Sequence, residues 1–366
     1  MASDLLYQIA LTQIPNIGHV HARTLLQHFG NAPAVFKATQ STLEKIEGIG
    51  SVRARSIRSF NGFKDAETEV NFIEQYKLQP LFITEPSYPQ RLLHCYDAPV
   101  LLYYKGEADL NAPKVLAVVG TRRNTEYGKQ VTESLIEKLS GLDVIIASGL
   151  AYGIDAVAHK CALQHALPTV GVLGHGLDQI YPPGHSSLAK EMLKQGGGLL
   201  TEFKSKIPPD KHNFPGRNRI VAGISDAVIL VETDIKGGSM ITAEIANSYN
   251  RDVFAVPGRT SDKKSEGCNY LIRNNKAILL TDASELINIM GWEEKNVTRR
   301  AQKELFIELD EEEKKIIALL KEKENTTIDE LNIKSGMSAS SVAGVLLQLE
   351  LMGIIISLPG KIYKLI

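Results

Sequence analysis

The hydrophobic positions of the chain fall into two patterns, and the clearer one begins near residue 113. From there on, short and uniformly apolar runs alternate with amphipathic helical segments. Such runs predict buried strands of a parallel sheet that helices cover on both faces, which is a Rossmann-like doubly wound α/β fold. The runs are VLAVVG, DVIIAS, PTVGVLG, GLLTEF, AVILVE, DVFAVPG and AILLT. Two further candidate strands, PLFIT and VLLYY, precede them, and we expect these to extend the sheet or to lead into it.

The N-terminal part of the chain contains an internal repeat with a helical pattern. Its two copies are IPNIGHVHARTLLQHFG and IEGIGSVRARSIRSF. Each copy predicts a helix, a tight turn at Gly18 or at Gly48 and Gly50, and a second helix, as in helix-hairpin-helix units. In such units the glycine lets backbone N–H groups approach a phosphate. The first 60 residues hold six basic side chains against three acidic ones, but a helical packing module without a ligand fits equally well.

The C-terminal part predicts three helices and a terminal β-hairpin, which is the pattern of a winged helix. The predicted sheet domain is therefore preceded by the helix-hairpin-helix (SAM-like) module and followed by the winged helix. Thr327 and Ser338 are candidate N-caps of two of these helices. The expected recognition helix, SASSVAGVLLQLELMG, contains no lysine or arginine, and from Glu308 onward ten acids face seven lysines. This favours a protein partner over DNA. We therefore predict a helix-hairpin-helix domain at 1–66, a Rossmann-like domain at 67–292, a linker at 293–306 and a winged-helix domain at 307–366.

Composition narrows the class of protein. The chain has 366 residues, of which 43% are hydrophobic and 23% are charged, and its net charge is -1. These values are typical of a soluble globular protein, and the sequence contains neither a signal peptide nor a membrane-spanning run, so we expect it in the cytoplasm. The three cysteines lie far apart, which argues against a disulfide framework and against a zinc site. We predict no metal.

Classical nucleotide cofactors do not fit the loop after the first long strand. In the dinucleotide fingerprint counted from Gly120, Arg122 and Thr125 stand where glycines are required. A bulky side chain would occupy the place of the pyrophosphate. The Gly-rich phosphate loop of ATP-binding proteins is missing as well, so we predict no cofactor.

The loops that follow the strands carry groups that bind anions. Arg122 and Arg123 precede the first predicted helix, and Gly237, Gly238 and Ser239 precede a later one, whose N-terminal amides attract a phosphate. Since ligands bind beyond the carboxyl ends of parallel strands, these groups are expected to meet at one edge of the sheet.

The segment HNFPGRNR combines an aromatic ring with several cations. Phe214 offers a stacking face, and Lys211, Arg217 and Arg219 offer charges at nearly the spacing of successive phosphates. This composition is typical of a single-strand nucleic-acid site. In the alternative interpretation, Phe214 fills the core, and the two arginines form salt bridges with Glu202 or Glu232.

Catalytic constellations are weak in this sequence. Asp155 and His159 share a helix face, but a structural role is the simpler interpretation because no third ligand is evident. No nucleophile elbow and no pair of carboxylates with a clear task is present. We therefore predict a binding protein and not an enzyme.

The serial motifs resemble one bacterial family, the DNA-processing protein A (DprA or Smf) family. They are VVGTRRNTEYG, ASGLAYGIDAVAHKCAL, GVLGHGLDQIYPPGH, FPGRNRIVAGISDAVILVE, GGSMITAEIANSYNRDVFAVPG and GCNYLIRNNKAILLTD. The resemblance implies a non-enzymatic homodimer that binds and protects incoming single-stranded DNA in natural transformation. It also implies that the protein loads the RecA recombinase onto that strand.

The same resemblance assigns DNA contacts to particular residues. They are Gly120, Thr121 and Arg122, then Lys211, Phe214, Pro215, Arg217, Asn218 and Arg219, and finally Gly237, Gly238 and Ser239. One departure from the family pattern is Lys204-Ser205-Lys206, which stands where a glycine-rich turn is expected.

A second resemblance supplies a rival function. GGSMITAE is similar to the phosphate turn of the Rossmann-like phosphoribohydrolases, which cleave nucleoside monophosphates. In that interpretation Glu244 and Arg122 would be catalytic. A small-molecule hydrolase, however, has no need of two basic hairpins and a winged helix.

Overall fold

A computed structural model describes residues 2–292, 310–323, 326–358 and 361–365. The chain divides into two compact units, residues 1–293 and 294–366. The predicted linker, 293–306, lies outside the described residues.

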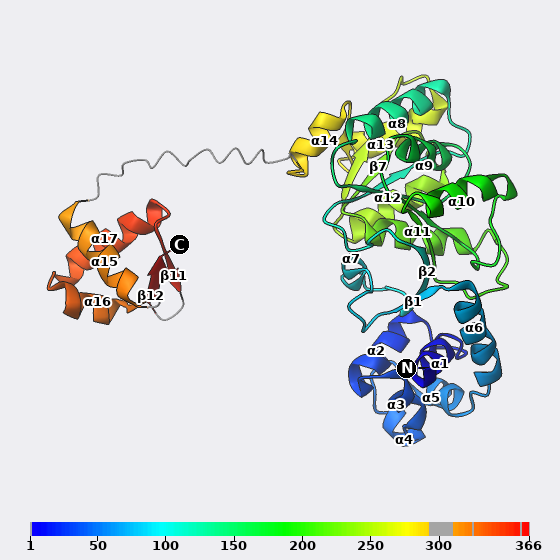
Figure 1. The fold of residues 1–366 in the computed structure, drawn as a ribbon, viewed down its shortest axis with the longest axis horizontal. Helices are drawn as coiled ribbons and strands as arrows, with labels where there is room; N and C mark the ends of the chain where they lie inside the picture. Colours follow the sequence, from blue (N-terminus) through cyan, green and yellow to red (C-terminus); the bar gives the residue numbers. More distant parts are fainter. Residues whose placement is uncertain (1, 293–309, 324–325, 359–360, 366) are drawn as a thin grey trace. The chain divides into compact units, whose positions relative to one another are not determined.

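The larger unit, shown in Figure 1, is built on a nine-stranded sheet whose strands have the order β1-β2-β6-β5-β4-β3-β7-β8-β9. Strands β3 to β9 run parallel, β2 pairs antiparallel with β6 at one edge, and β1 pairs antiparallel with β2. This confirms the predicted doubly wound sheet and its extension by the two preceding strands. The strands are β1 (Gln79–Phe82), β2 (Leu101–Gly106), β3 (Val115–Val119), β4 (Ile145–Ser148), β5 (Thr169–Val172), β6 (Gly198–Thr201), β7 (Ala227–Leu230), β8 (Asp252–Ala255) and β9 (Ile278–Leu279).

Helices cover both faces of this sheet and follow the strands in alternation. Side chains of α8, α9 and α14 form one core with the sheet, while those of α11, α12 and α13 pack on the other face. Every residue of β3, β4 and β7 is buried, as uniformly apolar runs predict. The helices are α7 (Gln90–Leu93), α8 (Glu126–Lys138), α9 (Ile154–Gln164), α10 (Ser186–Lys194), α11 (Asn213–Ile224), α12 (Gly238–Ser248), α13 (Glu266–Arg273) and α14 (Ala283–Ile289), with 3-10 turns at Pro183–His185 and Lys263–Ser265.

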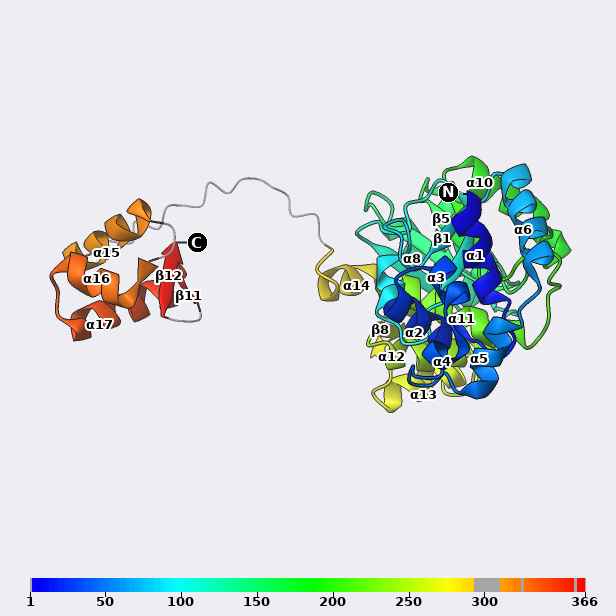
Figure 2. The same cartoon turned by 90° about the horizontal axis from the view of Figure 1, so that it is seen from below.

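The N-terminal helical module belongs to the same compact unit and lies beside β1 (Figures 1 and 2). Its helices are α1 (Ala2–Thr12), α2 (His19–Phe29), α3 (Ala32–Lys37), α4 (Gln40–Leu43), α5 (Ser51–Arg58) and α6 (Phe63–Tyr76). Both predicted hairpins are present: Gly18 precedes α2, and Gly50 precedes α5. The two turns touch each other, because Arg53 donates hydrogen bonds to the carbonyls of Asn16 and Gly48.

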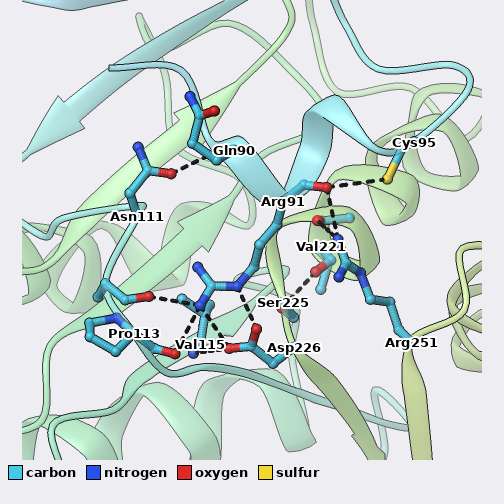
Figure 3. A network of polar contacts seen from close by, with 12 residues as sticks. Gln90, Arg91, Cys95, Asn111, Pro113, Val115, Val221, Ser225, Asp226 and Arg251 are labelled. Atoms are coloured by element: carbon cyan, nitrogen blue, oxygen red, sulfur yellow. Dashed lines mark hydrogen bonds and ion pairs between the residues drawn. The ribbon is translucent and has the colours of Figure 1, made fainter. Parts of the chain in front are cut away.

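An arginine network fastens the connecting segment to the sheet (Figure 3). Arg91 on α7 binds both carboxylate oxygens of Asp226, at 2.6 and 2.9 Å, and Asp226 also accepts the amide of Val115 at 2.8 Å. Asp226 immediately precedes β7, and Val115 begins β3. The network therefore lies at the amino ends of these strands, opposite the edge where a ligand is expected.

The smaller unit has the predicted winged-helix order. It consists of α15 (Glu311–Glu322), β10 (Thr326–Thr327), α16 (Ile328–Ser335), α17 (Ala339–Leu351), β11 (Ile355–Leu358) and β12 (Ile362–Leu365), with the sheet order β10-β12-β11. Both predicted N-caps are confirmed, since Thr327 accepts the amide of Glu330 and Ser338 that of Ser341. Within the described ranges of both units, no helix has the length and apolarity to cross a membrane.

Candidate nucleic-acid interface

A cleft of about 640 Å³ opens at the carboxyl ends of β3 and β7. Strand β3 has β4 on one side and β7 on the other, so the cleft lies at the point where the strand order reverses. All the predicted contact residues except Arg219 line it. They are Gly120, Thr121, Arg122, Lys211, Phe214, Pro215, Arg217, Asn218, Gly237, Gly238 and Ser239.

The turn after β3 is held by Glu232, a buried acid that follows β7. Its carboxylate accepts the backbone amide and the hydroxyl of Thr125, and its carbonyl accepts the amide of Thr121 at 2.6 Å. The alternative salt bridges from Glu232 to Arg217 or Arg219 are therefore wrong. Glu232 thus holds the buried side of the turn, and the side chains of Arg122 and Arg123 on its other side are exposed to solvent.

The start of α9 presses directly on this turn. Gly153 has φ +79°, and a Cβ at this position would lie 2.1 Å from the carbonyl oxygen of Thr121. Only glycine tolerates both the left-handed backbone and the close approach. The loops after β3 and β4 consequently form one wall of the cleft.

Phe214 stands in the first turn of α11 with cations on its ring. The guanidinium carbon of Arg122 lies 5.3 Å from the ring centroid, and that of Arg217 lies 5.8 Å away. The Tyr181 ring, with its centroid 6.0 Å from that of Phe214, extends the aromatic surface. Phe214 is half-buried beside these two guanidiniums and Lys211 is exposed, so part of the aromatic surface and one lysine side chain face solvent.

Arg217 is almost fully buried beneath the ring of Phe214. Its guanidinium donates to the carbonyl oxygens of Gly149 and Val172. Burial lowers the pKa of Arg217 to about 10, which leaves it charged at neutral pH. The positive charge thus lies in the floor of the cleft, attached to the ends of β4 and β5.

Arg219 is the predicted contact that the structure places elsewhere. It forms an ion pair with Glu202 and donates to the carbonyl of Asp97. His19 of the N-terminal module contacts the same Glu202 at 2.8 Å. Because α11 turns by roughly 100° per residue, Arg217 and Arg219 point in different directions. The alternative interpretation, an ion pair with Glu202, therefore describes Arg219, and its assignment to the cleft is corrected.

The start of α12 forms the opposite wall. No side chain from the described part of the chain caps this helix, and a Cβ on Gly238 would meet none of its atoms within 4 Å. Ser239 instead points inward and donates to the hydroxyl of Thr233 at 2.7 Å, and Asn218 donates to the carbonyl of Gly238 at 3.3 Å. Ser239 and Asn218 therefore serve packing, which leaves the backbone amides of Gly238 and Ser239 as the candidate anion-binding groups of this wall.

Two glycines that sequence reasoning missed make room for the site. A Cβ on Gly149 would lie 2.6 Å from the guanidinium of Arg217, and one on Gly174 would lie 2.9 Å from the ring of Phe214. Tyr181 and Lys264 were missed as well, although both line the cleft. Tyr181 stands in the loop after the third predicted strand, which is the only signal that the sequence offers for it.

The chain departs from the family pattern at Lys206, and the structure shows how it adapts. Lys206 adopts φ +65°, the left-handed conformation that a glycine would adopt without strain. Asp178 accepts its amide at 3.0 Å. The neighbouring Ser205 donates its amide and hydroxyl to the buried carboxylate of Glu69 on α6. The loop that leads to Lys211 is therefore held from both sides.

Asp155 and His159 have separate structural roles. Asp155 accepts the amides of Gly149 and Ala151. The hydroxyl of Thr169 donates to the carbonyl of Ile146, so it accepts a hydrogen from Nδ1 of His159, at 2.6 Å. Burial lowers the pKa of His159 to about 3, which keeps the ring neutral. No group of three or more metal-ligating side chains occurs among the residues that the structure describes.

Three family models match the chain. The model for DNA recombination-mediator protein A covers residues 79–291, that for the DprA winged helix domain covers 301–361, and that for the helix-hairpin-helix motif covers 9–69.

Named relatives cover the chain along most of its length. Protein Smf of Synechocystis is 32% identical over 99% of both chains, and Protein Smf of Escherichia coli is 36% identical over 82% of this chain and 81% of that one. The X-ray structure of DNA processing protein A from Streptococcus pneumoniae matches 77% of this chain and 96% of its own, with a TM-score of 0.65 and 32% identity. A structure of DNA processing protein A from Helicobacter pylori, described by its single-stranded DNA binding mode, matches 58% of this chain and 95% of its own, with a TM-score of 0.53 and 32% identity.

Proposed function

The chain belongs to the DNA recombination-mediator protein A family, and we propose that it binds single-stranded DNA in the cleft at the ends of β3 and β7. One observation carries the proposal: the exposed Arg122 and Lys211 and the ring of Phe214 line one cleft, above the buried charge of Arg217. Stacking on an aromatic ring and cations along the backbone are the two requirements of a sequence-tolerant single-strand site. The structure of the Helicobacter pylori relative supports the same ligand.

We also propose that the protein acts by binding alone. Glu244, the catalytic candidate of the rival hydrolase, is exposed on α12 and does not line the cleft. From the family resemblance we further propose that the protein is a cytoplasmic homodimer. In this proposal it protects incoming DNA in transformation and loads RecA onto that DNA. The acidic winged-helix unit is expected to bind a protein partner.

Fluorescence anisotropy of a labelled oligo-dT across a salt series tests the site. Arg122→Ala and Lys211→Ala should weaken binding and reduce the salt slope by about 0.7 for each lost phosphate contact. Phe214→Ala should weaken binding roughly 5- to 150-fold with little change in slope, because stacking on one ring contributes about 1–3 kcal/mol.

Lys160→Ala is the matched control, since Lys160 is an exposed lysine on α9 that does not line the cleft. Equal affinity of all variants and the wild type would place the DNA elsewhere. Release of a free base from nucleoside monophosphates, abolished by Glu244→Gln, would support the hydrolase instead.

A further inference from the structure

A second cavity, of about 290 Å³, lies between the N-terminal module and the loop that carries Lys211. The hairpin turn after α1 and the segment after α5 form one side, and Lys204 reaches it from the sheet region. Its lining includes Gln13, Ser59, Phe60, Asn61, Asp65 and Lys204. Neither the predicted contacts nor the family models assign a ligand to this place.

The side chains of this cavity match a nucleobase better than a phosphate. Asp65 would repel an anion, but its carboxylate can accept hydrogen bonds from the N–H groups of a base. Asn61 and Gln13 each carry a carboxamide, which both donates and accepts. Lys204 is the cation of the cavity lining and lies on the loop from the first cleft, where a backbone phosphate would arrive.

Gln13 provides an independent sign of a missing ligand. Its Nε2 atom is buried and has no hydrogen-bond partner among the residues that the structure describes. A buried donor without a partner is unfavourable, and because Gln13 lines the cavity, a carbonyl oxygen of a base is a suitable partner for it.

One loop joins the two cavities. Lys204 lines the second, whereas Pro209 and Lys211 line the first. Lys211 follows Lys204 by seven positions, so their Cα atoms are at most about 25 Å apart. The bonds of Glu69 to Ser205 and of Asp178 to Lys206 hold this loop in place. A single strand in the first cleft can therefore continue along the loop.

We propose that this cavity is a second subsite, which takes a nucleobase of the strand bound in the first cleft. The inference rests on the proposed function and adds to it a role for the N-terminal module. The module contributes a base contact to the DNA path through Asn61 and Gln13, in addition to packing against the sheet.

The test compares three labelled oligonucleotides on the full chain. One is an oligo-dT of about six nucleotides, one is about twenty nucleotides long, and one is equally long but abasic beyond the first six. Asn61→Ala should weaken binding of the long oligo-dT about 3- to 10-fold, the effect of one lost hydrogen bond, and leave the short and abasic strands unaffected. Lys204→Gln should weaken binding of both long strands.

Unchanged affinity of both variants for the short strand shows that the first cleft is still folded. Lys211→Ala should weaken binding of all three strands, because it acts in the first cleft. Equal affinity of Asn61→Ala and the wild type for the long oligo-dT would overturn the second subsite, as would an equal loss on the abasic strand. If the wild type binds none of the three, the proposed function itself fails and the second subsite with it.

Discussion

At the scale of single residues, two glycines make room for the large side chains of the cleft. Gly174 leaves room for the ring of Phe214, and Gly149 leaves room for the guanidinium of Arg217. The sequence indicates Phe214, Lys211 and Arg122 because an aromatic residue and cations stand close to strand ends. It does not indicate the two glycines or Tyr181, since their task depends on contacts between segments far apart in the chain.

Gly174→Ala should therefore impair DNA binding, although residue 174 is not one of the proposed DNA contacts. The new Cβ would lie 2.9 Å from the Phe214 ring, and overpacking of this kind costs about 1–3 kcal/mol. We expect the ring to move and the oligo-dT affinity to fall toward that of Phe214→Ala. Gly216→Ala is the control, because a Cβ at this position on α11 meets nothing within 4 Å. Anisotropy titrations measure the oligo-dT affinity of both variants. An affinity of Gly174→Ala equal to that of the wild type would contradict the prediction.

His159 should make stability depend on pH. Burial lowers its pKa to about 3 from the ordinary 6.5, so the unfolded chain binds a proton that the folded protein does not. The stability that this residue contributes is therefore complete above pH 6.5 and falls by up to about 1.4 kcal/mol per pH unit between pH 6.5 and 3. His159→Asn keeps a donor for Thr169 and removes the titration.

Urea unfolding, followed by the fluorescence of Trp292, reports on this unit, because Trp292 is the single tryptophan of the chain and is buried in its core. Between pH 7 and 4.5 the wild type should lose about 2–3 kcal/mol more than His159→Asn. Parallel pH profiles of the two proteins would show that His159 does not titrate in this way.

At the scale of elements, the hydrophobic pattern predicted the strands and the covering helices, but not how β1 and β2 pair. Uniform apolar runs mark burial on both faces, whichever direction a strand takes. The antiparallel pairing of β2 with β6 depends instead on the path of residues 61–112, of which the Arg91 network holds α7 against the sheet. Arg91 and Asp226 lie far apart in the sequence, so no local pattern announces their contact.

Arg91→Ala should destabilise the larger unit by about 2–3 kcal/mol. The substitution leaves the carboxylate of Asp226 without its cation, and both side chains are mostly buried, being 16% and 22% exposed. Lys138→Ala breaks the more exposed ion pair with Asp282 and should cost at most about 1 kcal/mol. Urea unfolding followed by Trp292 fluorescence measures the free energy of unfolding of both variants. Similar losses of unfolding free energy in the two variants would show that the Arg91 ion pair contributes no more than a surface pair.

At the scale of the whole molecule, the net charge of -1 hides a division of charge among the parts. The first 60 residues and the segment between Lys204 and Arg219 are basic, whereas the chain from Glu308 onward is acidic. This division was readable from the sequence. The sequence did not show which cations are paired with acids in the folded protein. Arg219, for example, forms an ion pair with Glu202 that only the folded chain shows.

The contact of Gly153 with Thr121 has a consequence for the kinetics of capture. Because the loops after β3 and β4 pack closely and Ile154 donates its amide to the carbonyl of Thr121, we expect this wall of the cleft to be formed before a strand arrives. A preformed surface spends little conformational entropy on binding, so encounter proceeds at a rate set by diffusion and charge. Differences in affinity between strands should then appear in how long each one resides on the protein, and hardly in how fast it is caught.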